Sequence, residues 1–230
     1  MEQLSNGYTL ELSREGFPLS TDSMLLAHFA KLPRNARVLD LGSGCATLGH
    51  LLCAKDPTCS VTGLEIREQS HLSALENIRR NDLQRRISSI CADLRVLPPQ
   101  ITPGSFHCCI SNPPYFSGGP ESAHAPAARQ ECYCTPDDLF QSAATALKFG
   151  GDFFLVHKPE KLGQLISCAS RVNLEAKKLC LIRHRPDTSI SLILLQFRKG
   201  AKPGLQLAEQ CLFTSQGDPT PFYREVYHIP

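Results

Sequence analysis

Short apolar segments alternate with amphipathic segments along most of the chain, and this alternation predicts strands and helices in turn. Strands are predicted over residues 37–41, 60–65, 87–92, 106–111, 152–157, 176–183 and 191–197. Helices are predicted over residues 47–54, 70–81 and 161–172, and from 136 up to the glycines at 150 and 151. Such alternation is typical of an α/β fold with a mostly parallel sheet and helices on both faces.

The two ends of this strand–helix alternation refine the predicted fold. The short link between the last two predicted strands indicates a hairpin, so we expect a seven-stranded sheet with one antiparallel strand. Residues 1–30 and 200–230 lie outside the strand–helix alternation. We expect one domain with its core at 31–199, an N-terminal extension at 1–30 and a C-terminal tail at 200–230. In the helix predicted over 70–81, Ser70 is the expected N-cap, and Leu72, Leu75 and Ile78 share the expected apolar face.

The composition suits a folded globular chain. The 230 residues are 42% hydrophobic and 20% charged, and no apolar run is long enough to cross a bilayer. Residues 1–20 lack the basic start and apolar centre of a signal peptide. Eleven cysteines without a secretion signal predict free thiols in the cytoplasm, and their spacing matches no zinc site, so we expect no metal.

The net charge of +2 conceals an uneven distribution. The segment 1–147 carries 12 basic and 15 acidic residues, whereas 148–230 carries 12 basic and 7 acidic residues. A basic patch on one part of a near-neutral chain is compatible with nucleic-acid binding, although a solvated face is the alternative. The candidates for phosphate contacts in the basic part are Arg183, Arg185, Lys199 and Lys202.

Acidic residues follow three successive predicted strands. Asp40-Leu41-Gly42-Ser43-Gly44 ends the first strand and opens a helix, and its two glycines let a ligand approach the backbone closely. Glu65 ends the second strand, where a carboxylate can accept from both hydroxyls of a ribose. Asp93 follows the third strand and can accept from an adenine amino group. These acids would otherwise only cap strand ends, but three in succession favour a nucleotide site.

The charge of the first acid narrows the choice of cofactor. After Gly42 and Gly44 the next glycine is Gly49, which does not fit the spacing of the dinucleotide fingerprint. Asp40 would repel a pyrophosphate but suits a cationic amino-acid group. S-adenosylmethionine carries an ammonium and a sulfonium and no phosphate, so it is the predicted cofactor.

The most specific motif, Asn112-Pro113-Pro114-Tyr115, follows the fourth predicted strand. The Asn112 carboxamide oxygen and the Pro113 carbonyl can each accept one N–H of a planar amino group. They would thereby stabilise the positive charge that develops as the nitrogen attacks a methyl group. The prolines restrict the backbone, and Tyr115 offers a ring for stacking. An ordinary Pro-Pro turn is the alternative.

Together these motifs resemble the Rossmann-like class I S-adenosylmethionine-dependent methyltransferases that act on amino groups. Further segments resemble the bacterial tRNA1(Val) adenine-N6 methyltransferase family, and the resemblance covers nearly the whole chain. These segments are 16–17, 20–27, 128–131, 157–160, 202–205 and 223–228. Position 46 is Ala, where such enzymes often have Gly, and its methyl group could crowd the methionine moiety.

The resemblance implies methylation of the adenine immediately 3′ of the anticodon in a valine tRNA. The N-terminal extension would close over the cofactor site through Thr21 and Asp22, and residues 112–115 would hold the flipped-out adenine. Arg129 would hold a phosphate of that nucleotide or order the surrounding loop, and both roles stay open. We expect a monomer with tRNA as its partner and with no membrane association.

Other functions stay open. A glutamine-N5 methyltransferase of release factors would share both motifs, but such enzymes usually carry an N-terminal helical domain, and fewer than 40 residues precede the first predicted strand. DNA adenine methylation would call for a target-recognition domain, for which the chain lacks room. A non-catalytic tRNA-binding protein with a methyltransferase fold predicts loss of motif residues, yet both motifs are intact.

Overall fold

The structure is a computed structural model that describes residues 2–3, 7–11, 20–113 and 134–229. Its strands are β1 (Glu2–Gln3), β2 (Thr9–Leu10), β3 (Arg37–Leu41), β4 (Ser60–Glu65), β5 (Ile87–Cys91), β6 (Phe106–Ser111), β7 (Leu147–His157), β8 (Leu174–Arg183), β9 (Ile190–Lys199) and β10 (Gln206–Cys211). Its helices are α1 (Thr21–Phe29), α2 (Thr47–Lys55), α3 (Glu68–Arg80), α4 (Pro136–Ala146), the 3₁₀ turn η2 (Pro159–Lys161), α5 (Leu162–Arg171) and α6 (Pro221–Tyr227).

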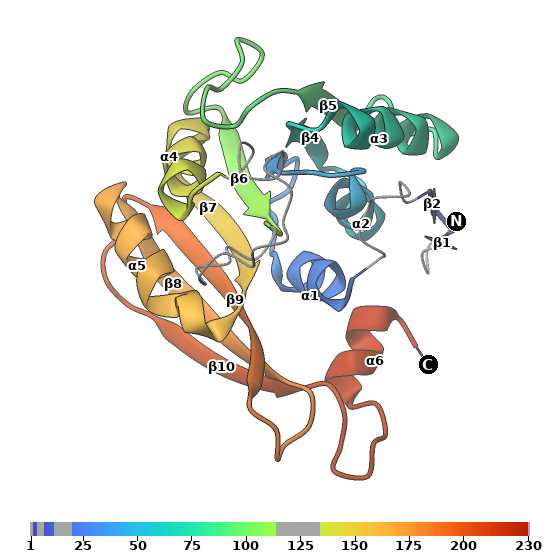
Figure 1. Cartoon of the computed structure of the whole chain (residues 1–230), viewed down its shortest axis with the longest axis vertical. Helices are drawn as coiled ribbons and strands as arrows, with labels where there is room; N and C mark the ends of the chain where they lie inside the picture. The colour runs from blue at the N-terminus through green and yellow to red at the C-terminus, as the bar shows by residue number, and fades with distance from the viewer. Residues whose placement is uncertain (1, 4–6, 12–19, 114–133, 230) are drawn as a thin grey trace, which may run out of the picture.

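The main sheet has eight strands in the order β10-β8-β9-β7-β6-β3-β4-β5 (Figure 1). Strand β9 runs antiparallel to β7 and β8, and all other neighbours in this sheet are parallel. The expected mostly parallel sheet with one antiparallel strand is therefore confirmed. The eighth strand, β10, comes from the expected C-terminal tail. Its residues are only half-buried or exposed at the sheet edge, so they lack the apolar pattern of an inner strand.

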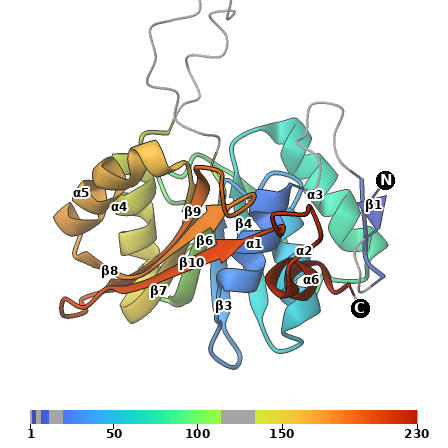
Figure 2. The same cartoon turned by 90° about the horizontal axis from the view of Figure 1, so that it is seen from below.

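Helices cover both faces of the sheet and enclose two hydrophobic clusters (Figures 1 and 2). Helices α1, α2, α3 and α6 lie on one face, and α4 and α5 lie on the other. Strand β7 serves both clusters, because Phe154 and Val156 point to the first and Phe153 and Leu155 to the second. Burial on both faces explains why this strand reads as a continuous apolar run.

Helix α3 differs from its prediction in both start and orientation. It begins at Glu68, so Ser70 lies inside the first turn and is not the N-cap. The side that faces the core consists of Ser70, Ala74, Asn77 and Ile78, at intervals close to 3.6 residues per turn. The expected apolar face is therefore wrong for two of its three members, since Leu72 and Leu75 are 50% and 42% exposed.

The end of α4 also differs from its prediction. A capping box at Thr135 starts the helix as expected, but it ends at Ala146, four residues before Gly150. Gly150 and Gly151 belong to β7, where the pairing with β6 shifts register and Gly150 has a φ of +75°. These glycines allow an irregularity in the strand, because a positive φ costs glycine little.

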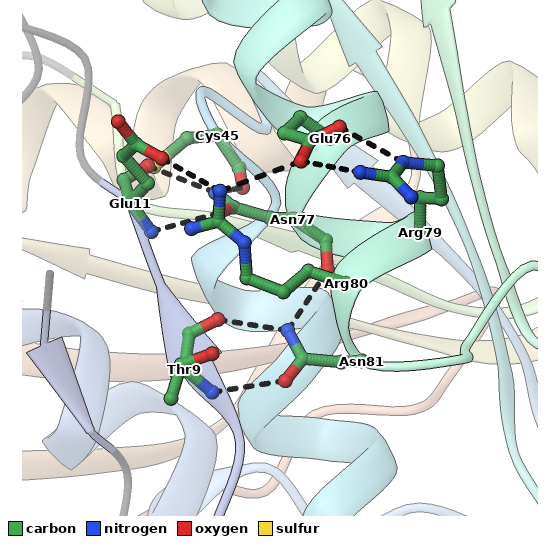
Figure 3. A network of polar contacts seen from close by, with 8 residues as sticks. All are labelled: Thr9, Glu11, Cys45, Glu76, Asn77, Arg79, Arg80 and Asn81. Atoms are coloured by element: carbon green, nitrogen blue, oxygen red, sulfur yellow. Dashed lines mark hydrogen bonds and ion pairs between the residues drawn. The ribbon is translucent and has the colours of Figure 1, made fainter.

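Asn77 of α3 and Asn81, the C-cap of this helix, fasten the N-terminal segment to the domain (Figure 3). The Asn77 amide accepts from the backbone N–H of Glu11 at 2.8 Å and donates to its carbonyl at 3.0 Å. The Asn81 amide pairs with Thr9 in the same way, at 2.9 and 2.8 Å. Positions i and i+4 of a helix are separated by about 6 Å, close to the i, i+2 spacing of an extended chain. The two side chains therefore pair with alternate residues as a neighbouring strand would.

We expect Asn77→Ala to lower the free energy of unfolding by about 2–4 kcal/mol, because it leaves the buried carbonyl of Cys45 and partly buried backbone groups of Glu11 without their partner. Urea unfolding measures this loss. The matched control is Glu76→Ala, which removes exposed ion pairs to Arg79 and Arg80 and should leave the unfolding midpoint close to that of the wild type. Equal losses in the two variants would contradict the role given to Asn77.

Candidate active site

The carboxyl ends of β3, β4 and β6 meet at one edge of the sheet. Strand β3 lies between the other two, and Asp40 is in register with Gly63 of β4 and Ile110 of β6. The Ser111 hydroxyl donates to the carbonyl of Leu41 at 2.7 Å and joins the ends of β6 and β3. Asp40, Glu65 and the start of the 112–115 motif are thus on neighbouring strand ends, at the edge where α/β sheets bind ligands.

The Asp40 carboxylate is buried without a partner. The residue is 1% exposed, and neither carboxylate oxygen has a hydrogen bond within the described part of the chain. Burial, with a smaller contribution from the nearby charge of Glu65, raises the pKa of Asp40 to about 8. A buried polar group without a hydrogen bond is costly, and a ligand that carries an ammonium group would remove that cost.

A tight turn after β3 leads from Asp40 to helix α2. The backbone N–H groups of Gly42 and Ser43 both donate to the Leu64 carbonyl at 2.9 Å, which holds the turn against β4. Gly42 and Gly44 have φ angles of +79° and +55°, in the region that other residues rarely adopt. A Cβ atom at either glycine would contact nothing within 4 Å, so backbone conformation rather than crowding favours glycine there.

Ala46 also adopts a left-handed conformation, with a φ of +67°. It occupies the N-cap position of α2 and makes no side-chain capping bond. Glycine is the residue best suited to such backbone angles, because it has no Cβ atom. The alanine here carries a modest conformational cost and buries its methyl group.

Glu65 binds the backbone of the turn at Gly42–Gly44 and keeps capacity to bind a ligand. Its two carboxylate oxygens accept from the backbone N–H groups of Gly44 and Arg67, both at 2.8 Å. The residue is 5% exposed. Each carboxylate oxygen has a second lone pair, so Glu65 can still accept from a ribose hydroxyl.

Asp93 differs from Asp40 because it already has a cationic partner. Its oxygens accept from the Arg95 guanidinium Nε at 2.8 and 3.0 Å, and this contact lowers the pKa of Asp93. The backbone N–H of Ala92 donates to the Glu65 carbonyl at 3.0 Å and brings the segment beside β4. Asp93 is therefore near the expected edge, in an ion pair that the sequence pattern did not suggest.

The start of α1 lies against the end of β6. Ser20 caps the helix, and its hydroxyl accepts from the backbone N–H of Ser23. The Asn112 amide Nδ2 donates to the Ser23 hydroxyl at 3.0 Å, and the Tyr227 hydroxyl donates to Thr21 Oγ1 at 3.0 Å. Burial raises the pKa of Asp22. The predicted cofactor-closing residues, Thr21 and Asp22, thus lie beside the residue whose side chain contacts Asn112.

Only part of the 112–115 motif is described. Asn112 is half-buried and Pro113 is buried, directly after β6. Pro114, Tyr115 and Arg129 lie outside the described residues, so their predicted roles stay predictions.

The four basic candidates do not lie together. Arg183 is at the carboxyl end of β8, where it pairs with Glu209 at 2.5 Å, and Arg185 follows it. Lys199 ends the antiparallel strand β9 and is therefore at the opposite edge of the sheet, opposite Leu174 at the start of β8. Its ammonium donates to the carbonyls of Ala144 and Leu147 at 2.6 and 2.8 Å, which caps the end of α4.

Lys202 follows β9 at the same opposite edge, and its carbonyl accepts from the Lys177 ammonium at 2.9 Å. The phosphate contacts predicted for all four basic residues stay predictions. The antiparallel direction of β9 separates Lys199 and Lys202 from the strand ends that carry Asn112.

Sequence reasoning missed three residues that lie beside the predicted ones. Ser23 contacts Asn112, and Gly63 leaves space for the glycine turn, since a Cβ there would lie 2.5 Å from the Ser43 hydroxyl. Ile66 is 41% exposed and directly follows Glu65, the last residue of β4. Of these three residues, only Ile66 could have been noticed in the sequence, because it is an apolar residue directly after the acidic residue that ends a predicted strand. The contacts of Ser23 and Gly63 depend on tertiary neighbours.

Within the part of the chain that the structure describes, no helix is long and apolar enough to span a membrane. The same residues contain no cluster of three or more His, Cys, Asp or Glu side chains arranged to hold a metal ion.

Comparison with known proteins decides the family. Residues 19–167 match the model of the methyltransferase small domain. The chain belongs to this family. A tRNA1(Val) (adenine(37)-N6)-methyltransferase of Shewanella halifaxensis is 30% identical over 170 residues, which cover 73% of this chain and 68% of the relative.

Solved structures share the fold of this methyltransferase. A predicted O-methyltransferase from Agrobacterium tumefaciens has a TM-score of 0.76 at 22% identity, covering 90% of this chain and 96% of the other. A geranyl diphosphate methyltransferase in complex with S-adenosylmethionine has a TM-score of 0.57 at 11% identity, covering 77% and 84%. The protein is an S-adenosylmethionine-dependent methyltransferase, and the unpartnered Asp40 carboxylate fits the ammonium group of that cofactor.

We expect the affinity for S-adenosylmethionine to rise between pH 6 and pH 7.5, because Asp40, with a pKa of about 8, must lose its proton to pair with an ammonium group. Titration calorimetry in buffers of different ionisation enthalpy should detect the proton released on binding. Asp40→Asn should bind more weakly and lose this pH dependence. An unchanged pH dependence in the variant would rule out Asp40 as the titrating group.

The ligand-free protein should show the opposite trend in stability. The folded-state pKa of Asp40 lies above its ordinary value of 3.8, so ionisation opposes folding increasingly as the pH rises from 4 towards 8. Asp40→Asn should therefore stabilise the ligand-free protein more at pH 8 than at pH 5, as measured by urea unfolding. A gain in stability that is independent of pH would contradict the raised pKa.

Proposed function

We propose that this methyltransferase transfers the methyl group of S-adenosylmethionine to N6 of an adenine in tRNA, and that the substrate is the adenine 3′ of the anticodon in a valine tRNA. The observation that carries the proposal is the juxtaposition of Asp40 and Asn112. Asp40 is the penultimate residue of β3 and Asn112 directly follows β6, which pairs with β3, so a methyl donor held at Asp40 and an amino group held at Asn112 would be neighbours.

The cofactor supplies, when bound, an electrophilic methyl group on a sulfonium. In the proposed site, Asp40 pairs with the ammonium of the methionine moiety, and Glu65 accepts from the ribose hydroxyls. Asp93 accepts from the amino group of the cofactor's adenine, and the turn at Gly42 and Gly44 lets these groups approach the backbone. Thr21 and Asp22 cover the cofactor from the start of α1.

Asn112 and Pro113 carry the proposed chemistry. The Asn112 carboxamide oxygen and the Pro113 carbonyl each accept one N–H of the target amino group, which leaves its lone pair localised on nitrogen. Both acceptors stabilise the positive charge that develops on that nitrogen during transfer. The proton leaves after transfer, so the proposal requires no strong general base.

The names of related proteins support RNA adenine as the acceptor. The relative from Shewanella halifaxensis acts, by its name, on adenine 37 of tRNA1(Val). In our proposal the flipped adenine stacks on Tyr115 beside Pro114, and Arg129 contacts the RNA backbone or orders its own loop. Arg183 and Arg185, at the same sheet edge as Asn112, contribute positive charge toward the RNA. We infer a monomeric enzyme of the cytoplasm.

The experiment that tests the function is nucleoside analysis of modified tRNA. The purified protein is incubated with S-adenosylmethionine and with total bacterial tRNA that lacks this modification, and anticodon-loop nucleosides are then analysed by mass spectrometry. We expect N6-methyladenosine at the position 3′ of the anticodon. A parallel incubation contains a release factor in place of tRNA, and methylation of its glutamine instead would identify a glutamine-N5 methyltransferase. Binding of tRNA without methyl transfer to either acceptor would indicate a non-catalytic RNA-binding protein.

Asn112→Ala should reduce methyl transfer by at least about 100-fold, because the variant loses one of the two acceptors for the target amino group. Affinity for S-adenosylmethionine, measured by calorimetry, should stay within about threefold of the wild type, since Asp40 and Glu65 are intact. A variant that keeps wild-type turnover would contradict the catalytic role of Asn112.

A further inference from the structure

The orientation of the Asn112 carboxamide decides whether it can take part in the proposed transfer. Its oxygen accepts a hydrogen bond, whereas its nitrogen only donates. If the group rotated by 180°, the NH₂ would face the NH₂ of the target and neither could accept. A residue that distinguishes the two ends of this carboxamide would therefore control the reaction.

Ser23 contacts one end of the carboxamide. Asn112 Nδ2 donates to Ser23 Oγ at 3.0 Å, and within the described part of the chain this is the hydrogen bond that the Asn112 side chain makes. The bond occupies the nitrogen and leaves the oxygen to accept. Ser23 is 7% exposed, so little water competes for its hydroxyl.

Ser20 makes the Ser23 oxygen an acceptor. The Ser20 hydroxyl accepts from the backbone N–H of Ser23 and donates its own proton to Ser23 Oγ, both at 3.3 Å. Ser23 Oγ thus accepts from Ser20 and from Asn112. Because Ser23 Oγ accepts a hydrogen bond from the helix cap Ser20, its position suits an acceptor, which binds the nitrogen of the carboxamide rather than its oxygen.

Helix α1 is held firmly enough to maintain this contact. The Lys55 ammonium donates to the carbonyls of Ala27, His28 and Ala30 at 2.8 to 2.9 Å and caps the end of the helix. At the other end, Thr21 accepts from Tyr227 of α6. Both ends of the helix that carries Ser23 are therefore fastened to other elements.

We propose that Ser23 is a positioning residue for methyl transfer, which binds the Asn112 nitrogen so that the Asn112 oxygen faces the target amino group. The proposal rests on the proposed function of Asn112. It assigns to α1 a role in the acceptor site in addition to its predicted role over the cofactor.

The first test compares the kinetics of Ser23→Ala with those of the wild type. Ser23→Ala should lower kcat about tenfold and leave KM for tRNA and for S-adenosylmethionine within about twofold, because the carboxamide is present but wrongly oriented for much of the time. Unchanged kcat, or a rise in KM alone, would overturn the proposal.

Ser191→Ala is the matched control. It removes a half-buried serine hydroxyl that donates to the Ile182 carbonyl at 3.1 Å, in the β8–β9 hairpin. This variant should show wild-type kcat. Ser23→Thr retains a hydroxyl at the same atom position and should recover most of the activity lost in Ser23→Ala. An equal loss of kcat in Ser23→Ala and Ser191→Ala would reduce the effect to general destabilisation and overturn the proposal.

A second measurement does not depend on the RNA substrate. In the wild type the Asn112 side-chain NH₂ should show a dispersed NMR signal with slow hydrogen exchange, and Ser23→Ala should move it toward exposed-amide shifts and fast exchange. If this signal behaves as expected but the wild type methylates no adenine, the proposed function is wrong, whereas the hydrogen bond between Asn112 and Ser23 is confirmed. If the wild-type amide exchanges as fast as an exposed one, the contact itself is overturned.

Discussion

A buried carboxylate at the end of β3, without a hydrogen bond to any residue that the structure describes, is the constraint on which the site depends. Asp40 lies between strands that end at Glu65 and Ser111, in a position where burial holds its pKa near 8. Such a group is unfavourable in the ligand-free protein and becomes favourable with a cation beside it. Two features hold this carboxylate in place: the glycine turn bound to the Leu64 carbonyl, and the hydrogen bond between Ser111 and Leu41. They do so at a cost in folding stability.

The N-terminal part of the chain completes the site through tertiary contacts. Asn77 and Asn81 bind the segment around residues 9–11 to α3, and Ser23 on α1 contacts Asn112. Helix α6, near the other end of the chain, reaches α1 through the bond between Tyr227 and Thr21. Segments separated by about 200 positions therefore support the same candidate acceptor group.

Departures from the sequence prediction have local physical causes. Leu72 and Leu75 were predicted to face the core, yet both are exposed. Helix α3 instead turns Ala74, Asn77 and Ile78 inward, because the Asn77 amide must lie beside the backbone groups that it binds. Strand β10 was missed because its edge position requires little burial. The reversed direction of β9, which the predicted hairpin implies, brings the Lys199 ammonium to the carbonyls that end α4.

The sequence by itself determined the α/β class, the order of most strands and helices, and the motifs at the ends of the first four predicted strands. These properties are local, since they follow from hydrophobic periodicity and from small or acidic residues at strand ends. Only the tertiary structure decided which strand ends are neighbours and that Ser23 contacts Asn112. It also decided that Asp93 pairs with Arg95, whereas Asp40 has no partner among the described residues. Contacts between residues 89 positions apart in the chain depend on packing, and no periodicity encodes them.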